Sequence, residues 1–230
     1  MGEMVFPESD FYLNNLSLHL QQPNVSLFSA EMWFEYSASI FTGFLTENLG
    51  GVQTLRRIWE ACRTQTADVA IQKVCGDFRE IFTAFWCYNY LRAYKDGTKY
   101  PVPEALEVKQ LPFRLDSSQI AEPQYYGANL IKFSAIDAAR PLQIVVSGRK
   151  GTVLGAKVIV IDAATKRWKI TPVAASSDGT LRATASGAQQ AVLVIANFPE
   201  GSASYTLSAS QCAGAVLGAW GSGLGARGSG

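Results

Sequence analysis

The 230-residue chain carries 20 Lys and Arg against 19 Asp and Glu, and 48% of its residues are hydrophobic. A chain of this length and composition can bury a sizeable core and is not disordered. Its net charge of +1 supplies no basic field for gathering nucleic acid, so we expect no nucleic-acid partner. Residues 1–4 lack the features of a secretion signal, and no apolar run reaches the roughly 18 residues of a membrane-spanning helix.

Residues 1–95 predict an α-helical domain. Apolar residues recur at helical spacing in five stretches, which are separated by breaks such as Pro23 and Gly76. The fifth stretch begins after Asp77, and Glu80 three positions further on predicts a capping box. The aromatic residues within 82–90 recur at helical spacing, so we expect them to form core rather than a binding platform.

The rest of the chain predicts a linker, a β-sandwich and a tail. Residues 96–123 contain four prolines and no periodicity, which indicates an extended linker. Residues 124–210 contain about seven short β-branched stretches, which are typical of an antiparallel sandwich. The uniformly apolar stretches Val158–Ile161 and Val192–Ile195 predict central strands covered on both faces. Residues 211–230 are rich in glycine and predict a flexible tail. The predicted fold class is therefore α+β multidomain, with a helical half followed by an antiparallel sandwich.

The four cysteines do not form the spacing of a metal site or a disulfide framework. Cys62, Cys75 and Cys87 occupy apolar-periodic positions in predicted helices, where cysteine usually acts as a small buried hydrophobe. We expect free thiols, although neither the pairing of these three residues nor that of Cys212 follows from the sequence.

His19 is the only histidine, so this chain alone cannot build a metal site that needs two histidines. On a helix, Ser17 and His19 project about 200° apart, which excludes a nucleophile–base pair between them. We therefore expect an ordinary surface histidine or a buried one with its hydrogen bonds satisfied. No catalytic, cofactor-binding or metal-ligating residue is assigned, and no cofactor is expected.

Two glutamates could carry chemistry. Residues 33–38 resemble the Trp-x-Glu-x-x-Ala segment that supplies the third zinc ligand of helical metalloproteases, which would make Glu35 a ligand. The His-Glu-x-x-His motif that such a site needs is missing, so we expect Glu35 on the exposed side of a core helix. Glu31 and Glu35 are four residues apart on one helix face, a spacing that leaves a glycosidase with two carboxylates open.

Several packing motifs, taken in chain order, resemble those of a known family. They are Val5–Glu8 before Phe11–Leu13, Gln22–Leu27, Phe44–Gly50, Leu55–Glu60, Phe78–Asn89, Tyr125–Gly127 and Val192–Asn197. Together they cover most of residues 5–210 and resemble the region downstream of the active site in bacterial secreted zinc metalloproteases of the His-Glu-x-x-His type. The resemblance implies the back of a helical catalytic half followed by a β-sandwich, in the extracellular space or cell envelope. It places the zinc ligands before Met1, so no catalytic position transfers to this chain.

Three hypotheses of function follow. The first is a non-catalytic fragment or remnant of a metalloprotease-like secreted protein. The second is a binding or adhesion module whose sandwich recognises a glycan or a cell-envelope protein. The third is a glycoside hydrolase that uses only carboxylates. If the helical half lacks neighbouring helices, it should expose an apolar face. The sequence does not fix the oligomeric state.

Overall fold

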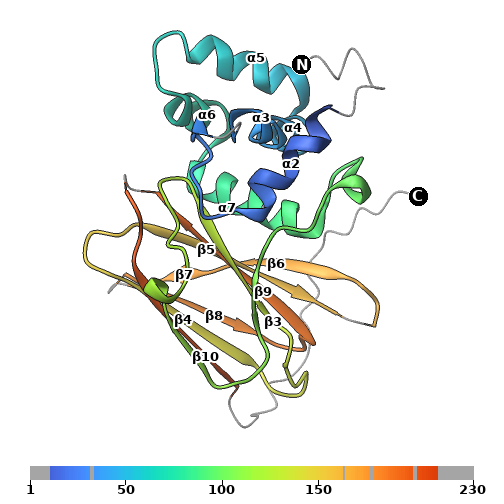
Figure 1. Ribbon diagram of the computed structural model, residues 1–230, viewed down its shortest axis with the longest axis vertical. Helices are drawn as coiled ribbons and strands as arrows, with labels where there is room; N and C mark the ends of the chain where they lie inside the picture. Colours follow the sequence, from blue (N-terminus) through green and yellow to red (C-terminus); the bar gives the residue numbers. More distant parts are fainter. Residues whose placement is uncertain (1–10, 32–33, 163, 177–178, 199–200, 212–230) are drawn as a thin grey trace.

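The computed structural model describes residues 11–31, 34–162, 164–176, 179–198 and 201–211. Its helices are α2 (Phe11–Gln21), α3 (Phe34–Ser37), α4 (Ser39–Asn48), α5 (Gly51–Ala61), α6 (Ala67–Cys75) and α7 (Phe78–Leu91). Helix α7 lies between the other helices and the strands, and α5 lies at the end of the molecule furthest from the strands (Figure 1). The prediction of a helical first half is confirmed.

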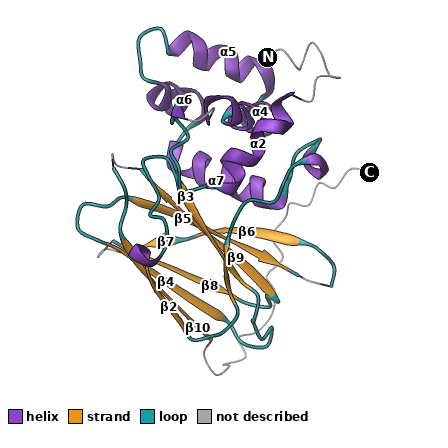
Figure 2. Cartoon of the chain, viewed as in Figure 1, coloured by secondary structure: helices purple, strands orange, loops and turns teal. Residues whose placement is uncertain are grey.

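The strands form two five-stranded sheets, which confirms the α+β fold class (Figure 2). They are β1 (Leu106–Val108), β2 (Phe113–Asp116), β3 (Ala128–Phe133), β4 (Leu142–Gly148), β5 (Leu154–Ile161), β6 (Trp168–Pro172), β7 (Ala174–Ala175), β8 (Thr180–Ala185), β9 (Gln190–Asn197) and β10 (Tyr205–Gln211). Sheet A has the order β1-β3-β9-β5-β6, and sheet B has the order β2-β10-β4-β8-β7. All pairs are antiparallel except β1 with β3, which is parallel.

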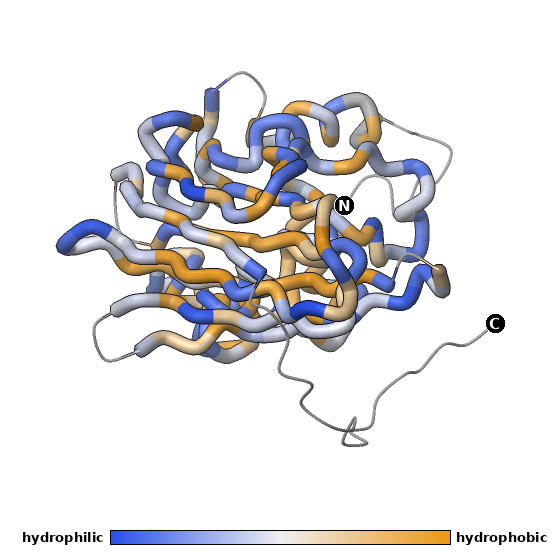
Figure 3. The backbone as a smooth tube through the Cα atoms, turned by 90° about the horizontal axis from the view of Figure 1, so that it is seen from below, coloured by the Kyte–Doolittle hydropathy of each residue, from blue (hydrophilic) through white to orange (hydrophobic). Residues whose placement is uncertain are grey.

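The sheets and helices form three layers with two apolar interiors. Along β9, Val192 and Val194 pack against the helices, whereas Leu193 and Ile195 pack between the two sheets. Successive side chains of a strand point to opposite faces, so a strand covered on both sides must be apolar throughout. The apolar strands accordingly run through the middle of the molecule (Figure 3). The prediction that Val192–Ile195 forms a covered central strand is confirmed.

The segment predicted as a linker, residues 96–123, is not simply a linker. It contributes β1 to sheet A and β2 to sheet B, so the sandwich begins before residue 124. Leu106 pairs with Ile131, and Phe113 pairs with Ala209 almost a hundred residues later. These strands are short and proline-flanked, and only distant partners hold them, which is why local periodicity did not reveal them. The predicted tail lies outside the described residues from Cys212 onward.

Asp77 begins α7 as predicted, but the capping box does not form. The Asp77 carboxylate accepts a hydrogen bond from the backbone N–H of Arg79. Glu80 instead pairs with Lys157 of β5, at 2.6 Å between Oε2 and Nζ. The Lys157 side chain is almost fully buried, so this contact gives its ammonium a partner where α7 crosses sheet A.

Candidate functional site

His19 is buried, and the expectation of a surface or hydrogen-bonded histidine is wrong. Its ring stacks on Trp86 of α7, with 4.9 Å between ring centroids, and also contacts Phe34 and Phe85. Within the described residues neither ring nitrogen has a hydrogen-bond partner. Burial lowers the pKa of His19 to about 4, because the charged form loses its hydration. A neutral ring enclosed by aromatic side chains has no route to a substrate at the surface.

The structure does not show Glu31 and Glu35 as a pair of facing carboxylates. Glu31 lies before α3 with an exposed side chain, and its backbone N–H donates to Ser29 Oγ at 3.3 Å. Glu35 lies in α3, and its side chain is outside the described part of the structure, so the glycosidase hypothesis stays a prediction. Across the residues that the structure does describe, no three His, Cys, Asp or Glu side chains gather closely enough to hold a metal ion.

Three cysteines are placed, and all three are free thiols as expected. Cys87 is buried within α7, and burial raises the pKa of its thiol to about 12. Cys75 is half-buried. Cys62 is exposed, so the expectation that it is buried is wrong. The reason is that α5 turns a second apolar stripe toward solvent. Cys212 lies outside the described residues.

A hollow of about 580 Å³ lies on the outer face of sheet B, on the side away from sheet A and the helices. It is lined by Arg114, Leu115, Asp116, Gln119, Val145, Ser147, Thr206, Leu207 and Ser208. Alternate residues of β4 and β10 point inward into the core, such as Val146 and Leu207, so their polar neighbours point outward. The polar lining of the hollow is therefore a direct consequence of period-two alternation.

The strand register orders these outward side chains into rungs that cross the sheet. One rung runs Asp116–Thr206–Ser147, and the next runs Arg114–Ser208–Val145–Arg182. Neighbouring strands in a sheet lie about 4.8 Å apart, and successive rungs are separated by two residues, or about 7 Å. The face thus offers hydroxyl groups at its centre and guanidinium groups at both ends of one rung.

The charges around the hollow favour an anionic or neutral ligand. Asp116 accepts hydrogen bonds from the backbone and hydroxyl of Ser118, which lower the pKa of its carboxyl, and Arg149 nearby adds to that effect. The Asp116 Oδ2–Arg149 Nη2 distance is 3.3 Å. Arg114 and Arg182 have no ion-pair partner within the described ranges. Because Asp116 pairs with Arg149, the guanidinium groups without an ion-pair partner on this face are those of Arg114, in the lining, and Arg182, at the other end of its rung.

The sequence did not predict this hollow, although the alternating polar residues that line it can be seen in the sequence. Thr206, Ser208 and Ser210 alternate with apolar residues along one stretch, as Gln143 and Ser147 do along another. Alternation identifies a solvent-facing row on each strand. It does not reveal that β10 pairs with β4 and with β2, because the paired residues lie 57 to 96 positions apart in the sequence.

Comparison with known proteins defines no family. No protein-family model matches the chain, and no curated protein matches it. A solved structure of the pre-peptidase C-terminal domain of collagenase from Bacillus anthracis is 16% identical, with a TM-score of 0.36, over 46% of this chain and 94% of that one. A family GH115 4-O-methyl-α-glucuronidase with specificity for decorated arabinogalactans is 10% identical, with a TM-score of 0.25, over 78% of this chain and 25% of that one.

Among the described residues, no helix is both long and apolar enough to cross a bilayer.

Proposed function

We propose that this chain is a non-catalytic binding protein, a part of a metalloprotease-like secreted protein whose sandwich recognises a polysaccharide. In this proposal the helical layer corresponds to the back of a protease domain, and the outer face of sheet B is the binding surface. The observation that carries the proposal is the hollow of about 580 Å³ with its crossing rungs of hydroxyl and guanidinium groups.

Polysaccharides suit this surface for two physical reasons. A sugar chain is extended and presents hydroxyl groups at regular intervals, which the side chains of Thr206, Ser208 and Ser147 can meet as donors or acceptors. Arg114 and Arg182 at the ends of one rung can pair with carboxylate groups on the sugars through two N–H donors each. We therefore expect acidic polysaccharides to bind more tightly than neutral ones.

The experiment is affinity electrophoresis of the full chain through gels that contain polygalacturonate, alginate or dextran. The protein should be retarded by the two acidic polymers and less by dextran. Ser208→Trp fills the hollow and should abolish the retardation, whereas Gln72→Trp, at an exposed position of α6 in the helical layer, should not. Equal mobility of all three proteins in every gel would refute the proposal.

The non-catalytic part of the proposal has its own assay. Incubation of the purified chain with casein, with and without a chelator, should give no cleavage. Chelator-sensitive cleavage that disappears on changing His19 or Glu35 would contradict it.

A further inference from the structure

Helix α5 carries two separate apolar stripes. One stripe faces the core, where Thr54 and Ile58 are buried. The other stripe consists of Val52, Trp59 and Cys62, which are exposed, and Leu55, which is half-buried and also packs against the core. These four positions are spaced by three, four and three residues, which places them on one side of the helix. The core therefore leaves Val52, Trp59 and Cys62 uncovered.

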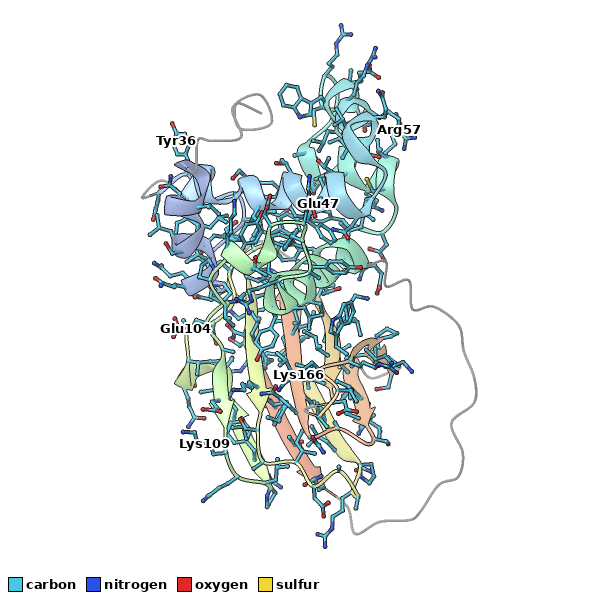
Figure 4. The ribbon with its side chains drawn as sticks, turned by 90° about the vertical axis from the view of Figure 1, so that its right-hand side faces the viewer. Tyr36, Glu47, Arg57, Glu104, Lys109 and Lys166 are labelled. Atoms are coloured by element: carbon cyan, nitrogen blue, oxygen red, sulfur yellow. The ribbon has the colours of Figure 1, made fainter. Side chains whose placement is uncertain are left out.

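The second stripe forms an open groove. A hollow of about 300 Å³ is lined by Val52, Leu55 and Trp59, with Arg56, Glu60 and Arg63 at its rim. Trp59 is 64% exposed and Val52 is 49% exposed. An exposed tryptophan beside further apolar side chains is the usual composition of an interaction surface. Helix α5 and Arg57 lie at the end of the molecule opposite Lys109 and the sheets, so the groove is open to a partner (Figure 4).

The spacing of this stripe identifies the shape of the occupant. Apolar residues at alternating intervals of three and four are the seam of a helix that packs against another helix, with knobs entering holes. In heptad terms Val52 and Trp59 occupy a positions, and Leu55 and Cys62 occupy d positions. A second helix lying along α5 would bury the groove and the Trp59 ring together.

The charges identify the occupant further. Arg56 and Arg63 are seven residues apart and flank the same side of the seam, at e positions. In an antiparallel pairing of two copies of this chain, e faces e, so arginines would oppose arginines. The opposite flank of the seam is Ile58, which the core already buries. Arg56 already pairs with Glu60 on the same helix, at 2.9 Å between Nε and Oε1, so Arg63 is the flanking guanidinium without an ion-pair partner among the described residues. A helix with acidic residues beside its apolar stripe instead places a carboxylate against Arg63.

We propose that the α5 groove, lined by Val52, Leu55 and Trp59, binds an acidic amphipathic α-helix of a partner protein. This interaction does not depend on the polysaccharide face, which lies at the other end of the molecule on sheet B.

The test uses two synthetic helices of about 21 residues, or three heptads, with leucine at a and d. One carries glutamate at its e and g positions and the other carries lysine there. Fluorescence anisotropy with the full chain should show the glutamate peptide binding at least tenfold more tightly than the lysine peptide. Trp59→Ala should weaken binding at least tenfold, and Arg63→Glu should reduce or invert the preference between the peptides.

A matched control distinguishes binding in this groove from non-specific binding to exposed tryptophan side chains. Trp168 on β6 is also exposed, at 45%, and its replacement by alanine should leave the binding of both peptides unchanged. Because Trp59 is a surface residue, its variant should keep the wild-type circular dichroism spectrum and melting temperature.

Three results would overturn the proposal. The first is equal binding, or no binding, of the two peptides. The second is a dimer in analytical ultracentrifugation that Trp59→Ala abolishes, which would make a second copy the occupant. The third is binding to phosphatidylglycerol vesicles that requires Trp59 while the glutamate peptide fails to bind. None of these results would change polysaccharide retardation, so the two proposals fail independently.

Discussion

Burial of His19 makes the stability of this protein sensitive to mild acid. The ring is fully enclosed by Trp86, Phe34 and Phe85, and its pKa is lowered from 6.5 to about 4. As pH falls from 7 toward 4, the unfolded chain takes up a proton on this imidazole while the folded chain does not, so the free energy of unfolding decreases. One pKa unit corresponds to about 1.4 kcal/mol, so the full loss is about 3 kcal/mol, of which about 2 kcal/mol is reached by pH 5.

The assay compares wild type with His19→Phe in urea denaturation at pH 7 and pH 5. The variant removes the titrating ring and its unpaired nitrogens, so it should be at least as stable as wild type at pH 7 and should lose about 2 kcal/mol less on acidification. Phe41→Leu, elsewhere in the same core, serves as control and should lower stability equally at both pH values. Parallel pH dependence of wild type and His19→Phe would refute the reasoning.

Three further predictions concern the core and the thiols. Gly127→Ala should lower the free energy of unfolding by more than about 2 kcal/mol, because an added Cβ would lie 2.2 Å from the carbonyl oxygen of Asn24; urea denaturation measures this. Lys157→Ala should cost about 2 kcal/mol in the same assay, since it removes a buried stem and its ion pair with α7. Iodoacetamide followed by peptide mapping should modify exposed Cys62 in the native protein and buried Cys87 only after unfolding, and early modification of Cys87 would contradict its burial.

Apolar periodicity in the sequence correctly predicted those helices and strands that form from neighbouring residues. Helix α7 begins after Asp77 and buries its aromatic face, and β9 is covered on both sides, as helical and uniform apolar patterns indicate. The same reasoning failed where the partner is distant. Glu80 fits a capping box by sequence but pairs with Lys157, which is 77 residues away.

The hollow on sheet B also could not be predicted in full, because its residues come from segments that are distant in the sequence. Outward polar rows on β4 and β10 follow from alternation, but the hollow also needs Arg114 and Asp116 from a segment whose prolines indicate a linker. The α5 groove is an intermediate case. An exposed apolar face was expected only if the helical half lacks neighbouring helices, and the sequence placed Leu55, Ile58 and Trp59 in one apolar stripe. Which of the two stripes on α5 faces the core depends on packing with neighbouring helices.

Binding at the outer face of sheet B is the central functional claim, and calorimetric titration tests it most directly. Polygalacturonate oligomers titrated into the full chain should give a saturable isotherm, with an affinity that Ser208→Trp lowers at least tenfold and Gln72→Trp leaves unchanged. Unaltered affinity in Ser208→Trp would show that the sugar binds elsewhere or not specifically, and would contradict the account.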